Sequence, residues 1–328
     1  MKKNQIAPKG EKQTKNIDQQ ANHKNLLHYC SVNLRAVCQI VADDSHMLIN
    51  KIGTSTYLDD PVLRPREITE IFRKQKGNTM NNIYHILNGD SLRAQFPEEL
   101  KGEILITREC LIDGDVQGSL NDDFFETRTK FIRDCYGNDG ETFYRQNIVT
   151  EFIKMQTIPD NADVNLWFED DLFCQINLWF VTSILNDKPL NRTCYLIRPK
   201  HGSEYSFGAM NTSELLCSYQ NRIPINANEL NLFSELWKSY QRNDCEQMLN
   251  IAGKLDSKFP FLLPAVHAHI DRIPTAGNPG RIIQTLAAII NDLGTTEFVP
   301  IFKEFEKRAG IYGLGDMQVR SILAKMDK

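Results

Sequence analysis

Acidic, glycine and arginine residues gather at three places in the sequence, each directly after a predicted strand. Asn88-Gly89-Asp90-Ser91 follows the first strand, Arg108-Glu109 the second, and Glu169-Asp170-Asp171 the third. Carboxylates suit acid–base chemistry or a divalent cation such as Mg²⁺, arginine suits an anion, and the amides of a glycine turn can cradle a phosphate. These residue types predict a site for a small phosphorylated or nucleotide-like molecule.

The residues of the three clusters have separate expected roles. The expected catalytic residues are Asp90, Ser91, Glu169 and Asp171, and the expected ligand-binding residues are Asn88, Gly89, Arg108 and Glu109. In this hypothesis the carboxylates hold a divalent cation or exchange protons, Arg108 holds an anion, and the backbone amides from Gly89 to Ser91 surround it.

Simpler structural roles remain open for the same residues. Asp90 or Ser91 suits the N-cap of a short helix, and Asp170 or Asp171 suits the N-cap of the apolar helix that follows. Arg108 also suits an ion pair with a carboxylate of the third cluster. Because one cap needs one carboxylate, three in a row favour a functional role for the third cluster.

Asp113-Gly114-Asp115 is a weaker candidate for a metal site. Two carboxylates at this spacing suit a divalent cation, but aspartate and glycine also favour turns for backbone reasons, and the turn is the favoured interpretation. His85 lies inside a predicted strand and is expected to be packed or hydrogen-bonded rather than to bind a ligand. The sequence contains no dinucleotide-binding glycine motif, no Walker loop and no His-Glu-x-x-His.

The elements that must position these clusters alternate between strands and helices. Strands are predicted at 83–87, 103–107, 164–168 and 193–197, and helices at 91–96, 122–135, 141–155 and 172–185. This alternation is typical of an α/β fold with a doubly wound, mainly parallel sheet, which binds ligands at the carboxyl ends of its strands. The three clusters are therefore expected to meet at that edge.

The chain is expected to have three parts. Residues 80–200 form the acidic α/β domain, and residues 201–328 form a mainly helical C-terminal domain in which the strand signals fade. Seven helices are predicted there, at 213–220, 228–242, 244–255, 261–270, 281–293, 297–308 and 316–326. Residues 1–79 are expected to be a disordered or mis-annotated extension, with Met80 as the natural start.

The composition excludes several classes of protein. The 328 residues carry a net charge of −4, 41% are hydrophobic and 24% are charged, as in a folded globular protein. No stretch approaches the roughly 20 apolar residues of a membrane span, the N-terminus lacks a secretory h-region, and none of the eight cysteines forms a Cys-x-x-Cys pair. We expect a cytoplasmic protein with reduced thiols and no membrane partner.

The charge distribution also bears on nucleic-acid binding. The acidic α/β domain disfavours a phosphate backbone. Residues 281–293 and 297–308 resemble a helix-turn-helix outline, which leaves a regulatory or scaffold protein, with a tail that binds a protein or DNA, as one alternative function. The last fifty residues are nearly balanced in charge, so packing is favoured over DNA recognition there.

A serine esterase is a further alternative. Gly89-Asp90-Ser91-Leu92 matches the opening block of the GDSL hydrolases, in which this serine is the nucleophile. Those enzymes supply the general base from an Asp-x-x-His near the carboxyl end, whereas the only such motif here is Asp43 to His46, before Ser91. The match to this family is therefore incomplete.

Three blocks of the chain resemble a bacterial family called domain of unknown function 1835. They are His85–Ser91, Gly102–Gly114 and Leu166–Phe173 with Gln175, and Gly313–Asp316 is similar to the end of such proteins. The resemblance implies a family domain from Met80 to about Pro199. Asp170 replaces the usual histidine, and Asp113-Gly114-Asp115 replaces the usual Glu-Gly-Pro. The function of the family is not established, so the resemblance implies motif positions and no reaction.

Overall fold

The computed structural model describes residues 82–119, 122–187, 191–202 and 205–326. The predicted extension at 1–79, with its proposed start at Met80, lies outside the described residues. The described chain divides into two compact units. Residues 129–144 belong to one, and the larger one contains the sheet and every predicted site residue. The sheet, the site and the C-terminal helices described below all belong to this larger unit.

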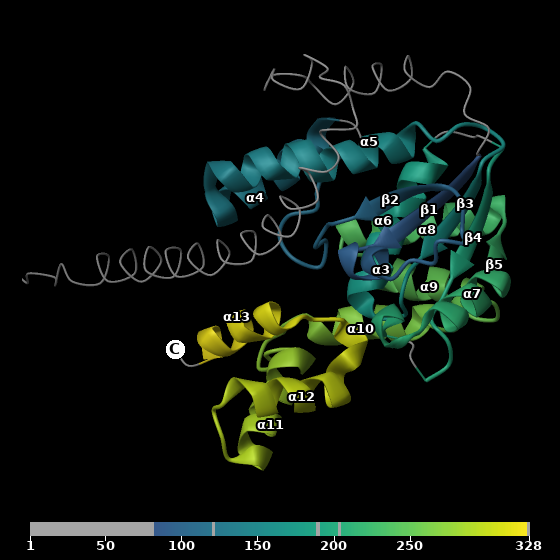
Figure 1. The fold of residues 1–328 in the computed structure, drawn as a ribbon. Helices are drawn as coiled ribbons and strands as arrows, with labels where there is room; N and C mark the ends of the chain where they lie inside the picture. The colour runs from purple at the N-terminus through teal and green to yellow at the C-terminus, as the bar shows by residue number, and fades with distance from the viewer. Residues whose placement is uncertain (1–81, 120–121, 188–190, 203–204, 327–328) are drawn as a thin grey trace, which may run out of the picture. The chain divides into compact units, whose positions relative to one another are not determined.

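A five-stranded sheet lies at the centre of this unit (Figure 1). Its strands are β1 (Ile83–Asn88), β2 (Glu103–Thr107), β3 (Asp163–Trp167), β4 (Thr193–Ile197) and β5 (Ile223–Ile225). The order is β2-β1-β3-β4-β5; the first four strands are parallel and β5 is antiparallel to β4. The predicted mainly parallel α/β fold is confirmed, and the four predicted strands agree to within one residue. The three-residue β5 was missed because Pro224 at its centre weakens the strand signal.

The helices follow the predicted alternation with one correction. In the first part of the chain they are α3 (Asp90–Ala94), α4 (Asp122–Phe143), the π-helix η1 (Tyr144–Val149), α5 (Thr150–Gln156) and α6 (Leu172–Asn186). The sequence predicted a gap between helices at 122–135 and 141–155, but helical structure continues across it. The interruption lies instead at Gly137, whose φ of 74° departs from the helix.

A run of helices follows β4 and confirms the predicted helical C-terminal part. Its members are the 3₁₀ helix η2 (Phe207–Ala209), α7 (Thr212–Gln220), α8 (Ala227–Gln241), α9 (Cys245–Leu255), α10 (Leu262–Arg272), α11 (Arg281–Leu293), α12 (Phe298–Ala309), the 3₁₀ helix η3 (Gly310–Tyr312) and α13 (Asp316–Met326). None of the described helices combines the length and apolar composition needed to cross a membrane.

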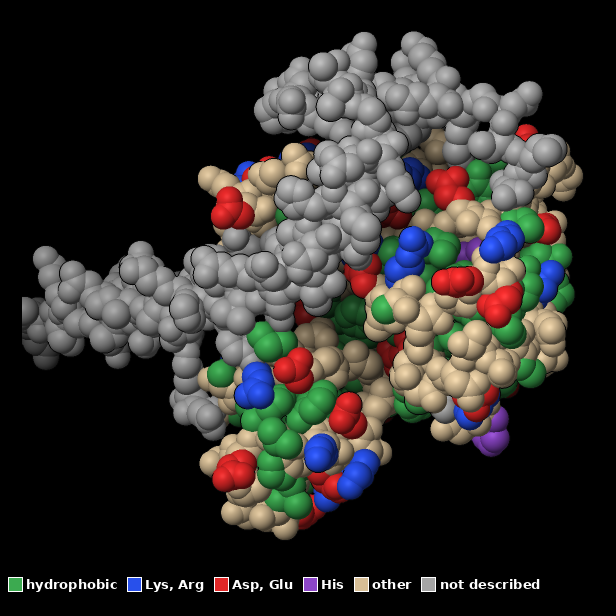
Figure 2. All heavy atoms as spheres, viewed as in Figure 1, with side chains coloured by type: hydrophobic (Ala, Val, Ile, Leu, Met, Phe, Trp, Pro, Cys, Tyr) green, Lys and Arg blue, Asp and Glu red, His purple; other side chains and the backbone are tan. Residues whose placement is uncertain are grey.

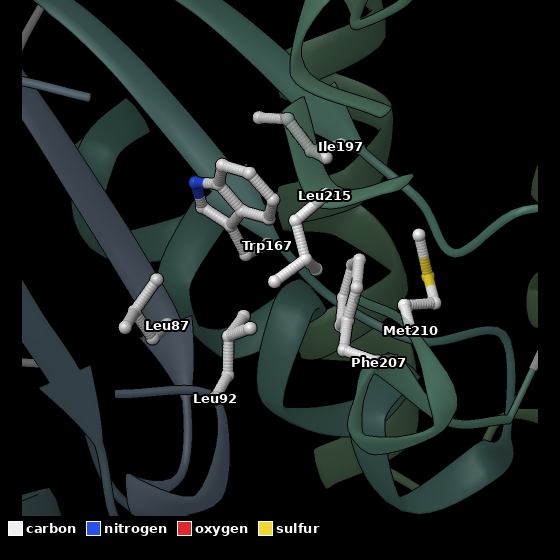
Figure 3. Packing of buried hydrophobic residues seen from close by; sticks show 7 residues of the cluster. All are labelled: Leu87, Leu92, Trp167, Ile197, Phe207, Met210 and Leu215. Atoms are coloured by element: carbon white, nitrogen blue, oxygen red, sulfur yellow. The ribbon is translucent and has the colours of Figure 1, made fainter. Parts of the chain in front are cut away.

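The strand ends that carry the predicted site are fixed by a buried hydrophobic cluster. Figure 3 shows its seven residues, which come from β1, α3, β3, β4, η2 with the residue after it, and α7: Leu87, Leu92, Trp167, Ile197, Phe207, Met210 and Leu215. Leu87 directly precedes the Asn88 cluster, and Trp167 lies two residues before Glu169. Packing at this density restrains the backbone on both sides of the site.

His85 belongs to the framework of the fold, as predicted. It is fully buried, and its Nδ1 accepts a hydrogen bond of 3.1 Å from Trp167 Nε1. Burial lowers the pKa of His85 to about 4, so the ring is neutral at physiological pH. Its ring also contacts those of Phe96 and Tyr219 edge-on or tilted.

Candidate functional site

A cavity of about 670 Å³ opens between the ends of β1 and β3, at the switch point where the strand order of the sheet reverses. The chain leaves β1 for β2 on one side and reaches β3 on the other, so the loops after β1 and β3 diverge at this point. Five of the eight predicted catalytic and ligand-binding residues line the cavity: Asn88 at the end of β1, Gly89 and Ser91 after it, and Glu169 and Asp171 after β3. The other three, Asp90, Arg108 and Glu109, do not line it.

The opposite wall comes from segments that the sequence did not connect with the site. The loop before α7 contributes Gly202, Tyr205, Ser206 and Ala209, and the C-terminal helices contribute Phe302, Phe305, Glu306, Ala309, Gly310 and the Gly313–Gly315 turn. Phe173 and Cys174 from the start of α6 complete the lining. The α/β part and the helical part therefore build the cavity together.

Glu169 is held by two hydrogen bonds at the edge of the cavity. Its Oε1 accepts from the backbone N–H of Phe207 at 2.8 Å, and its Oε2 accepts from Cys174 Sγ at 3.0 Å. Burial raises the pKa of Glu169, and these two hydrogen bonds oppose the rise. A carboxyl group whose pKa is raised by burial is a candidate proton donor and acceptor.

Asp171 caps α6, so the simpler structural role applies to this residue. Its Oδ1 accepts from the backbone N–H of Cys174 at 2.9 Å, and only 2% of Asp171 is exposed. Burial raises the pKa of the Asp171 carboxyl to about 7, although the hydrogen bonds from Cys174 lower it. The cap and the cavity therefore share one carboxylate that sits near its midpoint at neutral pH.

Cys174 is a site residue that the sequence analysis missed. Its buried thiol lies between the two carboxylates, which raise its pKa together with burial, so it stays protonated and is not a nucleophile. Asn88 Nδ2 donates to Cys174 Sγ at 2.9 Å, and Asn177 Nδ2 donates to Asn88 Oδ1 at 2.9 Å. The spacing could have indicated Cys174, because an N-cap side chain at 171 accepts from the backbone N–H three residues later. Cys174 must therefore lie beside Asp171.

A metal ion would find one group of candidate ligands in the described part of the chain. Glu169, Asp171 and Cys174 each place a potential ligand atom within 4.8 Å of the other two. Asp113 and Asp115 are not part of such a group: Asp113 Oδ2 accepts from Gln318 Nε2, and Asp115 Oδ1 accepts from the backbone N–H of Gln117. These contacts support the turn interpretation of the Asp113–Asp115 segment.

Asp90 and Arg108 form an ion pair beside the cavity. Arg108 Nε and Nη2 donate to the two carboxylate oxygens of Asp90 at 2.7 and 2.8 Å. The sequence analysis expected Arg108 to hold an anion or to pair with the third cluster, and its partner lies in the first cluster instead. Since β1 and β2 are neighbours, the residues that follow them meet directly.

Glu109 forms a buried ion pair that organises the loop after β2. Arg128 donates to both carboxylate oxygens of Glu109 at 2.9 Å, and 4% of Glu109 and none of Arg128 is exposed. Arg128 also donates to the carbonyl oxygens of Cys110, Asp113 and Asp115. This arrangement gives Glu109 a structural role away from the cavity lining.

Asp170, the middle carboxylate of the third cluster, points to a different partner from its neighbours. Arg198 at the end of β4 donates to both of its oxygens, with Nε to Oδ1 at 2.8 Å. The guanidinium group of Arg198 also lies 4.4 Å from the centre of the Phe261 ring. The three adjacent carboxylates thus have separate surroundings, which relieves their mutual repulsion.

Gly313 lies so close to Asp171 that a residue with a side chain would not fit at this position. Its φ is 63°, and a Cβ atom built on it would lie 2.0 Å from Asp171 Oδ1 and 2.6 Å from Asp171 Cγ. This contact joins the C-terminal turn to the N-cap of α6, across 142 positions of sequence. The turn lies against the carboxylate that lines the cavity.

Replacing Gly313 with alanine should therefore displace the C-terminal turn from Asp171. We expect a loss of unfolding free energy of about 1–2 kcal/mol for the left-handed backbone and about 1–3 kcal/mol more for the collision. Urea denaturation of Gly313→Ala measures the total. Gly294→Ala is the matched control, because Gly294 has a φ of 60° and open space around the new Cβ. Equal losses in the two variants would show that the turn does not press on Asp171.

Comparison with known proteins identifies no family for this chain. No family model, no curated protein and no solved structure matches the chain. The resemblance to domain of unknown function 1835 stays a prediction from its sequence blocks. The fold and the cavity define the chain as an α/β protein with a pocket at the switch point of its sheet.

Proposed function

We propose that this protein binds a small molecule in the cavity at the ends of β1 and β3 and acts on it by acid–base chemistry through Glu169. The observation that carries the proposal is the position of Glu169 and Asp171 in the lining of a cavity at the switch point of a parallel sheet. The raised pKa of Glu169 supports the role, because burial makes this carboxyl hold its proton more tightly than an exposed one.

The predicted phosphorylated or nucleotide-like ligand would need help from a cation at this site. No lysine, arginine or histidine is among the described residues that line the cavity. Arg108, which was predicted to hold the anion, already forms an ion pair with Asp90. A phosphate in the cavity would therefore require a divalent cation such as Mg²⁺ between its oxygens and the carboxylates of Glu169 and Asp171.

The two alternative functions receive less support from the geometry. Ser91 lines the cavity, but none of the described histidines does, so an esterase would lack its general base within the described residues. In the view of Figure 2, acidic and basic side chains are interspersed over α11, α12 and α13, whereas a DNA-recognition helix needs an excess of basic residues. A cytoplasmic location remains part of our proposal, and the six described cysteines, all free thiols, support it.

A thermal-shift screen of the full chain tests the proposal. The panel consists of AMP, ADP, ATP, inorganic phosphate, adenosine and a set of organic amines, each with and without Mg²⁺. Compounds that bind the folded state raise its unfolding midpoint. The shift should vanish in Ala209→Phe, which fills the cavity from its exposed wall, and persist in Ala287→Phe, a control on an exposed position of α11.

Turnover of a bound compound, followed by mass spectrometry, tests the role of Glu169. Glu169→Gln keeps the shape of the side chain but removes its proton exchange, so we expect turnover to fall by about 100-fold or more. Binding that survives Ala209→Phe would place the ligand elsewhere and would contradict the proposed site. Unchanged turnover in Glu169→Gln would contradict the acid–base role.

A further inference from the structure

The carboxylates at this edge of the sheet fall into two groups by charge balance. Three of them each hold an arginine through both oxygens: Asp90 with Arg108, Glu109 with Arg128, and Asp170 with Arg198. None of these three carboxylates lines the cavity. The fold thus supplies a counter-charge wherever a carboxylate at this edge faces away from the cavity.

The two carboxylates of this edge that line the cavity, Glu169 and Asp171, have no such partner. Neither Glu169 nor Asp171 forms an ion pair with a lysine, arginine or histidine within the described residues; they accept hydrogen bonds from the Phe207 and Cys174 amides and from the Cys174 thiol. Glu306 of α12 adds a third carboxylate to the lining. Removing ionised carboxylates from water without a positive charge beside them is unfavourable, so Glu169 and Asp171 favour a ligand that brings a positive charge.

Besides the polar side chains of Asn88, Ser91 and Ser206, the lining has an apolar and aromatic part. Phe173, Tyr205, Phe302, Phe305 and Leu314 contribute side chains to it. Aromatic faces attract cations, and the same faces pack against the hydrocarbon part of a ligand. At about 670 Å³ the cavity also has room for an organic molecule rather than for an ion alone.

We propose that the ligand of this cavity carries a protonated amine, which pairs with Glu169 and Asp171, on an apolar body that packs against the aromatic wall. This inference rests on the function proposed above and specifies the chemical class of its ligand. The amine supplies the counter-charge that Arg108, Arg128 and Arg198 supply to the other three carboxylates.

A metal ion fits the same cluster less well than an amine does. The Cys174 thiol already donates to Glu169, so a metal bound by all three residues would break this contact. Binding would also require the thiol to lose its proton, although its surroundings raise its pKa. An amine donates hydrogen bonds to the carboxylate oxygens and leaves the thiol unchanged.

A series of compounds of one shape and different charge tests the inference on the full chain. Phenethylamine, 2-phenylethanol, phenylacetate and phenyl phosphate are titrated by saturation-transfer NMR, together with agmatine, spermidine, choline, and Mg²⁺ or Zn²⁺ alone. We expect an amine to bind at least tenfold more tightly than the neutral and anionic compounds. Glu169→Gln should weaken that amine at least tenfold, while Ala287→Phe should leave its binding unchanged.

The outcomes separate this inference from the proposed function. If a neutral or anionic compound binds best and Ala209→Phe abolishes its binding, the cavity is a ligand site, but the inference that its ligand is a cation is wrong. Stoichiometric binding of Mg²⁺ or Zn²⁺ that excludes the amines also overturns the inference and favours a metal site. If none of these compounds and none of the nucleotide panel binds in the cavity, both proposals fail.

Discussion

Replacing Arg128 with methionine is expected to destabilise the protein by about 3–5 kcal/mol, because it leaves the Glu109 carboxylate buried without a counter-charge. The arginine is fully buried and reaches both oxygens of Glu109. The same substitution removes the donor for the carbonyl oxygens of Cys110, Asp113 and Asp115. Since small domains are stable by about 5–15 kcal/mol, a loss of this size should be plain in urea denaturation.

A double-mutant cycle separates the charge from the packing at this position. Glu109→Gln in the Arg128→Met background removes the uncompensated charge, so we expect it to restore part of the lost unfolding free energy. Arg308→Met is the control: this exposed arginine pairs with Glu304 and Asp292 on the surface and should have little effect. If the Arg128 and Glu109 substitutions are simply additive, the pair does not act as a unit.

The sheet could be predicted from the sequence because its parallel strands are short, apolar and β-branched. Glu103–Thr107 and Thr193–Ile197 were predicted with the observed bounds. Their parallel pairing followed from the helices between them, since a parallel connection needs a crossover. The antiparallel β5 was not predicted, because three residues around a proline carry no recognisable period.

The convergence of the clusters was predictable in part, but the partner of each side chain was not. The topology brings residues after β1 and β3 to one cavity, as the parallel sheet requires. Strand order determines that Arg108 meets Asp90, and the predicted strands did not specify that order. The sequence pattern of the third cluster likewise gave no sign that Asp170 faces Arg198 while Glu169 faces the cavity.

The wall formed by the C-terminal helices could not be predicted from local pattern. Helix α12 and the turn after η3 follow β3 by more than a hundred residues, and periodicity says which face of a helix is apolar but not what covers it. The close approach of Gly313 to Asp171 depends on a left-handed glycine that resembles many other turn glycines in sequence. The docking of this segment depends on tertiary contacts between distant parts of the chain, which local sequence patterns do not specify.

Replacing Asp171 with asparagine is expected to change how the stability of the protein depends on pH. Burial raises the pKa of this carboxyl from 3.8 to about 7, so between these values the folded chain binds a proton that the unfolded chain has lost. The contribution of Asp171 to stability is therefore complete below about pH 4 and falls as the pH rises toward 7. At about 1.4 kcal/mol for each tenfold change in proton affinity, the full effect is on the order of 4 kcal/mol.

Asparagine keeps the capping oxygen for the Cys174 amide but has no proton to lose. Relative to the parent chain, Asp171→Asn should therefore gain several kcal/mol of unfolding free energy between pH 4 and pH 8, measured by urea denaturation across that range. Asp244→Asn, which makes the same exchange at the half-buried N-cap of α9, is the matched control. A constant difference between Asp171→Asn and the parent would mean that the buried carboxylate stays ionised throughout, and that the cavity holds a full negative charge even at acid pH.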